Sequence, residues 1–224
     1  LKKKINFFEP HQLTQYRVDS FFIKEPETLE WIDNFKDNKN IIFWDIGANI
    51  GLYSCYAAKK NDCKVYAFEP SIFNLEILGR NVYLNNLNDK IIIIPIPLTE
   101  KNSESSFNFT TTELGGDLAT FGQDYTHDGS TLIKSFDYKT IGISIDEAVS
   151  LLGIPSPDYI KIDVDGIEHL ILKGGDKFLS HYKIKSILIE INENFEEQMN
   201  RSLDLLKENK FELKYKKHAK EFDS

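Results

Sequence analysis

Short, nearly continuous runs of apolar residues alternate along the chain with segments whose apolar residues recur every three or four positions. The continuous runs are rich in β-forming side chains, which is typical of strands buried on both faces of a parallel sheet, and they cover 40–46, 63–70 and 90–98. The amphipathic segments predict helices and cover 28–35, 51–60 and 71–86. Strand and helix therefore alternate through the first hundred residues.

The same alternation returns after residue 143. It predicts helices over 144–153, 166–175 and 195–210, and strands over 157–165, 184–192 and 211–217. This order predicts an α/β fold with a Rossmann-like, doubly wound, mostly parallel sheet. We expect an N-terminal entry segment with a helix over 1–39, the main domain over 40–217 and a tail over 218–224.

The stretch from about 99 to 133 breaks this pattern, because it is rich in Thr, Ser, Gly and Asp with scattered aromatic residues. A structureless loop of that length is unusual in a compact domain, so we expect a β-hairpin insert that acts as a lid or recognition element. Phe121 and Tyr125 are candidates to stack on a sugar ring, and Asp117 and Asp124 to bind its hydroxyls. A plain polar surface loop is the alternative.

Composition narrows the class of protein. The chain has 224 residues and a formal net charge of −8, which argues against broad binding to nucleic acid or anionic membrane. No apolar run approaches the roughly 20 residues of a membrane span, and the N-terminus lacks the apolar core of a signal peptide. Cys55 and Cys63 are the only cysteines, as expected of reduced thiols in a cytoplasmic protein.

The sequence DIGANIG, residues 45–51, lies where the first core strand turns into a helix. Gly47 and Gly51 permit a tight turn at the strand end, where open α/β sheets bind nucleotide-like ligands. A dinucleotide fingerprint would carry glycine instead of Asn49, and Asp45 would repel a diphosphate. An acidic strand end suits a cationic ligand such as S-adenosylmethionine. Glu69, at the end of the second strand, could accept the ribose hydroxyls of either cofactor.

A second acidic group follows the strand over 157–165. Asp163 and Glu190 end neighbouring predicted strands, and Glu168 opens a helix. Such carboxylates suit a general base, or ligands for a divalent cation such as Mg²⁺. The spacing of Asp165 and Glu168 also fits a capping box, a purely structural role, and His169 fits an ordinary helix histidine.

The segments WDIGANIGLYS, VYAFEPS, DYIKIDVDGIEHLILKGG and SILIEIN together resemble the FkbM-type methyltransferases, over about residues 20–217. The resemblance implies a class I, Rossmann-like methyltransferase domain and S-adenosylmethionine as cofactor. It implies a cofactor site at Asp45, Gly47, Ala48, Asn49, Gly51, Glu69 and Pro70, and an active-site edge at Asp163, Glu168 and Glu190. Asp165 stands where the family has glutamate, and Glu25 or Glu27 is expected near the methionine end of the cofactor.

The resulting hypothesis is an S-adenosylmethionine-dependent O-methyltransferase that acts on a hydroxyl of a sugar, glycan or similar polyhydroxylated molecule. Asp163 is the first candidate for the base, and a Mg²⁺ ion held by Asp163, Glu168 and Glu190 is the less favoured version. Two other classes stay open. One is a non-catalytic cofactor-binding module or subdomain of a larger glycan-building protein; the other, disfavoured by Asp45, is an NAD-dependent sugar-modifying enzyme.

Overall fold

A computed structural model describes residues 4–36, 40–180 and 184–217. Its core is a five-stranded sheet in the order β3-β2-β1-β7-β8, and every neighbouring pair of strands is parallel. The strands are β1 (Ile42–Ile46), β2 (Lys64–Phe68), β3 (Ile91–Ile94), β7 (Tyr159–Ile162) and β8 (Ser186–Ile189). The α/β fold with a mostly parallel sheet, predicted from the sequence, is confirmed.

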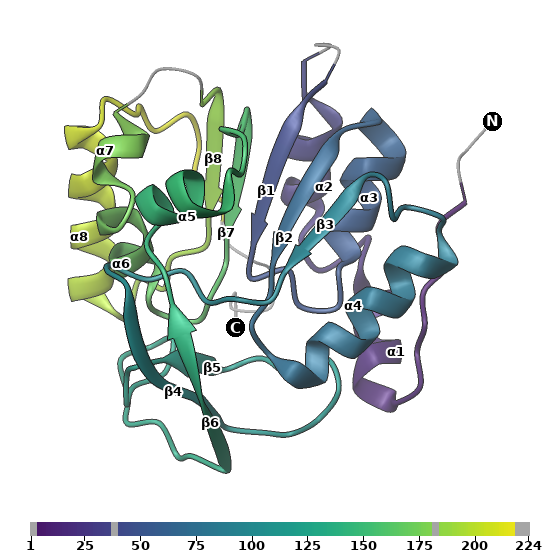
Figure 1. The fold of residues 1–224 in the computed structure, drawn as a ribbon, viewed down its shortest axis with the longest axis horizontal. Helices are drawn as coiled ribbons and strands as arrows, with labels where there is room; N and C mark the ends of the chain where they lie inside the picture. The colour runs from purple at the N-terminus through teal and green to yellow at the C-terminus, as the bar shows by residue number, and fades with distance from the viewer. Residues whose placement is uncertain (1–3, 37–39, 181–183, 218–224) are drawn as a thin grey trace.

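Helices cover both faces of this sheet (Figure 1). Alternate residues of each strand point to opposite faces, so Phe43 packs towards one helical layer while Trp44 and Ile46 pack towards the other. The first layer contains α2 (Pro26–Asp33), α3 (Leu52–Asn61) and α4 (Ile72–Leu84). The second contains α5 (Ile145–Leu152), α6 (Glu168–Lys173), α7 (Asp176–Leu179) and α8 (Glu196–Glu208).

The insert forms a three-stranded antiparallel sheet in the order β5-β4-β6. Its strands are β4 (Ser103–Phe109), β5 (Ala119–Phe121) and β6 (Phe136–Gly142), so the insert extends beyond the expected end near residue 133. Figure 1 shows it below the carboxyl ends of the parallel strands. The expectation that Phe121 stacks on a sugar was wrong, because this ring is only 2% exposed and packs in the core with Phe107 and Phe109.

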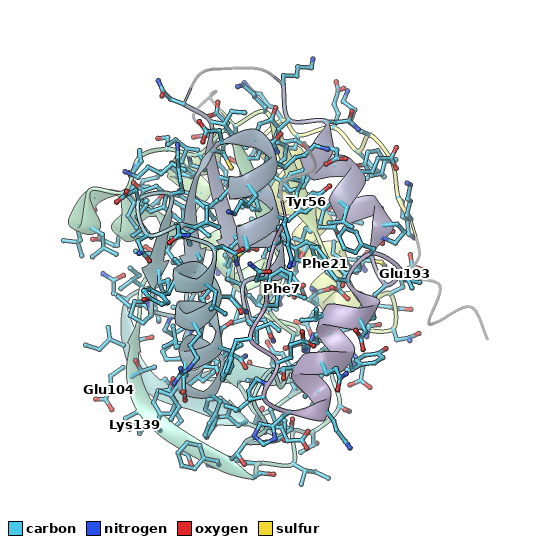
Figure 2. The ribbon with its side chains drawn as sticks, turned by 90° about the vertical axis from the view of Figure 1, so that its right-hand side faces the viewer. Phe7, Phe21, Tyr56, Glu104, Lys139 and Glu193 are labelled. Carbon is cyan, nitrogen blue, oxygen red and sulfur yellow. The ribbon has the colours of Figure 1, made fainter. Side chains whose placement is uncertain are left out.

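The N-terminal segment belongs to the same packed body. It carries the helix α1 (Gln12–Ser20), which the sequence did not indicate because few of its residues are apolar. Phe21, after this helix, is 2% exposed, and its ring contacts those of Phe7 and Tyr56 at centroid distances of 6.1 and 5.8 Å. These three rings lie together between the N-terminal segment and α3 (Figure 2).

The expected last strand over 211–217 was wrong, since the described part of this segment contains no strand. Its alternating apolar residues predicted one half-buried face, yet Leu213 is 74% and Tyr215 52% exposed. Ion pairs hold the segment instead, from Lys216 to Glu193 and from Lys217 to Glu30. The predicted tail over 218–224 lies outside the described residues. No helix within them is long and apolar enough to cross a membrane.

Candidate active site

A cleft opens at the carboxyl ends of the parallel strands. The strand order reverses there, since β2 and β3 follow on one side of β1, and β7 and β8 on the other. This is the place where open α/β sheets bind ligands. Seven of the ten predicted site residues line it: Gly47, Ala48, Asn49, Glu69, Pro70, Asp163 and Glu190. The other three do not: Asp45, Gly51 and Glu168.

The turn after β1 packs tightly against the end of β7. Gly47 has a φ of +81°, and a Cβ atom on it would lie 1.8 Å from the backbone oxygen of Asp163. Gly51, at the start of α3, has a φ of +82°, and a Cβ there would lie 2.3 Å from the Leu78 side chain. Both positions therefore require glycine. Gly51 does not line the cleft, and it allows α3 to pack closely against Leu78.

The backbone N–H groups of this turn donate hydrogen bonds to other groups of the protein. Those of Gly47 and Ala48 donate to the carbonyl of Phe68, each at 3.0 Å. The N–H group of Asn49 donates to Glu69 Oε2. Those of Ile50 and Gly51 donate to Asn49 Oδ1 and to the carbonyl of Ala48. A dinucleotide site presents such groups to a pyrophosphate, so this turn is unsuited to that ligand.

Glu69 is buried at the end of β2. Its two carboxylate oxygens accept hydrogen bonds from the backbone of Asn49 and Ser71, both at 2.7 Å. Burial raises its pKa to about 7, and the two backbone hydrogen bonds oppose that rise. The Asn74 side chain also hydrogen-bonds to this carboxylate. A carboxylate has about four acceptor sites, so Glu69 keeps some capacity to accept a hydroxyl donor in the cleft.

Asp45 lies beneath the turn and does not reach the cleft. Its Oδ2 accepts a 2.5 Å hydrogen bond from the Ser54 hydroxyl, while its buried Oδ1 has no hydrogen-bond partner among the described residues. Burial raises its pKa, and the nearby Lys161 ammonium opposes that shift. Asp45 is therefore not placed to make the direct ligand contact expected from the sequence.

Asp163 and Glu190 form a coupled acidic pair in the cleft, and their carboxyl groups hydrogen-bond to each other. Burial disfavours ionisation of Asp163, but the ammonium of Lys161, 2.5 Å from its Oδ2, holds the pKa of Asp163 below its usual range. The charge on Asp163, together with burial, raises the pKa of Glu190 to about 10. These opposite shifts favour the ionised form of Asp163 and the protonated form of Glu190.

Two further side chains close this end of the cleft. Glu25 stands at the start of α2, and Tyr53 in the first turn of α3 donates a 2.9 Å hydrogen bond to Glu25 Oε2. The Tyr53 ring also lies 5.0 Å from the Lys161 ammonium. Of the two glutamates expected near this end, Glu25 lines the cleft and Glu27 does not.

The segment over 164–168 folds differently from the expected capping box. Asp165 has a φ of +60°, and its Oδ2 accepts a hydrogen bond from the Leu118 backbone at 2.9 Å, while Ile167 is the N-cap of α6. The capping box prediction was wrong, because the side chain of Asp165 reaches across to the insert. Burial raises the pKa of Asp165 to about 8.

Glu168 is buried behind the cleft. Its carboxylate accepts hydrogen bonds from the backbone of Val164 and Gly166 and from the side-chain amide of Gln198 on α8. These contacts fix the loop that follows β7, and they turn Glu168 away from Asp163 and Glu190. In the part of the chain that the structure describes, no group of three or more His, Cys, Asp or Glu side chains is arranged to hold a metal ion.

Residues 115–118 of the insert, called the latch segment below, lie against the glycine turn that follows β1. The side-chain amides of Asn49 and Asn74 both donate to the carbonyl of Gly116 at 3.0 Å. Arg17 on α1 donates to the carbonyl of Gly115 and forms a 2.8 Å ion pair with Asp117. Asp117 lines the cleft, whereas Tyr125 packs against Phe195.

A model of the "Methyltransferase FkbM domain" matches residues 45–213. The chain belongs to the FkbM methyltransferase family. It is 30% identical over 152 residues to the hexuronic acid methyltransferase AglP of Haloferax volcanii, covering 67% of this chain and 56% of AglP. It is 23% identical over 209 residues to the methyltransferase sdnD of Sordaria araneosa, covering 81% of this chain and 80% of that one.

The fold also matches a solved structure, the precorrin-6y C5,15-methyltransferase of Geobacter metallireducens GS-15, with a TM-score of 0.51 and 13% identity. The match covers 92% of this chain and 78% of that chain, and it shows a shared fold. The part of this chain that matches AglP spans just over half of the length of AglP.

Sequence reasoning missed several residues of the cleft, among them Lys161, Arg17 and Asn74. Lys161 had a readable signal, since it is a lysine among apolar residues in a central strand. Arg17 and Asn74 had none, because they meet the latch segment through contacts between distant parts of the chain.

Proposed function

We propose that this FkbM family member is an S-adenosylmethionine-dependent O-methyltransferase that methylates a hydroxyl of a sugar, glycan or similar polyhydroxylated molecule. The observation that carries the proposal is the Asp163 carboxylate in the cleft, paired at 2.5 Å with the Lys161 ammonium and placed beside a glycine turn and the buried Glu69. A carboxylate held in its anionic form next to a cofactor pocket is suited to receive a proton from an acceptor hydroxyl.

The residues present fit this cofactor better than a dinucleotide. Glu69 keeps acceptor capacity for a ribose hydroxyl, and the carboxyl groups of Asp163 and Glu25 in the cleft favour a ligand that carries positive charge. The backbone N–H groups of residues 47–51 already donate hydrogen bonds within the protein, so this turn offers no free N–H donors to a diphosphate. When bound, S-adenosylmethionine supplies an electrophilic methyl group.

The chain's own contribution is alignment and proton transfer. In this assignment Asp163 would take up the proton that the acceptor hydroxyl loses when its oxygen receives the methyl group. Glu190, protonated at neutral pH, can donate a hydrogen bond to the acceptor or to Asp163. Glu168 holds the backbone behind Asp163, so we assign it a positioning role in place of the catalytic role expected from the sequence.

Two observations support a sugar-like acceptor. The lining of the cleft includes Tyr16 and Asp117, an aromatic ring and a carboxylate of the kinds that bind sugar rings and hydroxyls. The relative AglP carries the name hexuronic acid methyltransferase, which names a sugar acid as its substrate class.

The decisive experiment compares Asp163→Asn with the wild type by titration calorimetry and by transfer of a labelled methyl group to a panel of sugars. We expect the turnover of Asp163→Asn to fall about 100-fold or more while S-adenosylmethionine still binds. Asp204→Asn, an exposed substitution on α8, is the matched control and should behave as the wild type. Full turnover in Asp163→Asn would refute the base assignment, and binding of NAD without S-adenosylmethionine would refute the cofactor.

A further inference from the structure

Lys161 carries a charge in the middle of the central sheet. It lies on β7 between β1 and β8, and it is only 1% exposed. A lysine is almost never buried to this degree unless its ammonium is paired, because removing an unpaired charge from water costs several kcal/mol. Its position therefore requires a compensating set of anions.

Those anions surround the ammonium from several elements. Its closest contact is the 2.5 Å hydrogen bond to Asp163 Oδ2, and the face of the Tyr53 ring lies 5.0 Å away. The charged and titratable groups that act on Lys161 and Asp163 are Asp45 on β1, Glu25 before α2, Tyr53 on α3, Glu190 after β8, Arg17 on α1 and the neighbouring Asp165. The buried ammonium of Lys161 thus offsets the negative charge of a cluster that consists mainly of carboxyl groups.

We propose that Lys161 is the positioning residue of the active site: its buried ammonium keeps Asp163 ionised and oriented towards the acceptor, and leaves the proton of the acidic pair on Glu190. The inference rests on the proposed function for its catalytic consequence. It gives the cleft an internal cation at the point where an Mg²⁺ ion was the alternative source of positive charge.

The proton balance supports this role. With Lys161 charged, Asp163 has a lowered pKa, whereas Glu190 has a pKa raised to about 10 by its charged neighbour and by burial. Without the ammonium, two like carboxyls in contact would share their proton, and Asp163 would be protonated over a wider range of pH. Asp163 would then be a poorer proton acceptor at neutral pH.

The test is the pH dependence of turnover in Lys161→Met, which keeps an unbranched side chain, one heavy atom shorter, and removes its charge. We expect turnover at pH 7 to fall about 10- to 100-fold. We also expect the acid limb of the profile to move to higher pH, with little change in the affinity for S-adenosylmethionine. Lys161→Arg, which keeps the charge, should retain the acid limb of the wild type.

A readout that needs no acceptor separates this inference from the proposed function. Carboxyl ¹³C NMR of the cofactor-free protein, with Asp163→Asn used for assignment, should show Asp163 titrating at higher pH in Lys161→Met than in the wild type. If Lys161→Met does not fold, the double variant Lys161→Met/Asp45→Asn restores the charge balance of the cluster and takes its place. An unchanged titration of Asp163 in the folded variant would overturn the inference, even if the wild type proved inactive on every acceptor tried.

Discussion

At Gly47, the absence of a side chain decides whether the cleft can form. Replacement by alanine combines a φ of +81° with a Cβ only 1.8 Å from the Asp163 carbonyl oxygen, so the turn or the end of β7 must move. Left-handed backbone strain alone costs about 1–2 kcal/mol, and the overlap with backbone adds to it. We expect Gly47→Ala to lower the free energy of unfolding by at least about 2 kcal/mol in urea titrations, and to abolish cofactor binding.

Gly153 provides the control for this substitution. It has a φ of +61° at the end of α5, but a Cβ there would meet no atom within 4 Å. Gly153→Ala should therefore show only the cost of left-handed backbone, about 1 kcal/mol, and should bind cofactor normally. Equal effects of the two substitutions would mean that close packing against Asp163 is unimportant.

Between elements, the latch segment joins parts of the chain that are far apart in the sequence. Arg17 anchors it from α1 through Gly115 and Asp117, and Asp165 holds the backbone of Leu118 from the loop after β7. We expect Arg17→Met to loosen the segment, because its remaining anchors do not reach α1. Amide hydrogen exchange over 113–118 should become about tenfold faster, equivalent to about 1.4 kcal/mol of local stability.

Arg80→Met is the matched control for this change. Arg80 also pairs with a carboxylate, Glu76, but the pair is an exposed i,i+4 contact on α4, and such pairs contribute only a few tenths of a kcal/mol. Its exchange over 113–118 should equal that of the wild type. A faster rate in Arg80→Met as well would indicate a general loss of stability and not the release of a latch.

The core elements could be predicted from sequence because burial on both faces leaves a nearly continuous apolar run, as in 40–46 and 63–70. Elements that depend on distant contacts could not. The helix α1 has few apolar residues and is held by packing at its ends, while the segment over 211–217 alternates like a strand but has no neighbour to pair with among the described residues. The capping box failed for the same reason, since Asp165 hydrogen-bonds to the insert.

Across the whole molecule, the cleft was predictable wherever strand ends determine it. Glu69, Asp163 and Glu190 follow adjacent parallel strands, so the topology alone brings them to one edge. The direction of each side chain was not predictable: Asp45 and Glu168 come from the same edge, yet one lies under the turn and the other binds the backbone. Their roles depend on local hydrogen bonds that sequence spacing does not encode.

The buried acids also make the stability of the whole fold depend on pH. Asp165 and Glu190 have folded-state pKa values of about 8 and about 10, far above the 3.8 and 4.5 of the unfolded chain, because of burial and of the neighbouring Asp163 charge. Between those limits the folded state binds more protons than the unfolded state, so the free energy of unfolding decreases as pH rises. The lowered pKa of His169 acts in the opposite direction, but only below its ordinary value of 6.5. We therefore expect the free energy of unfolding of the cofactor-free protein, measured in urea, to fall by at least about 1 kcal/mol between pH 7 and 9.

Glu190→Gln, which keeps a hydrogen-bonding group without the ionisable proton, should flatten that decrease. A free energy of unfolding that rises over this range, or a slope that Glu190→Gln leaves unchanged, would show that Glu190 is not protonated in the folded protein.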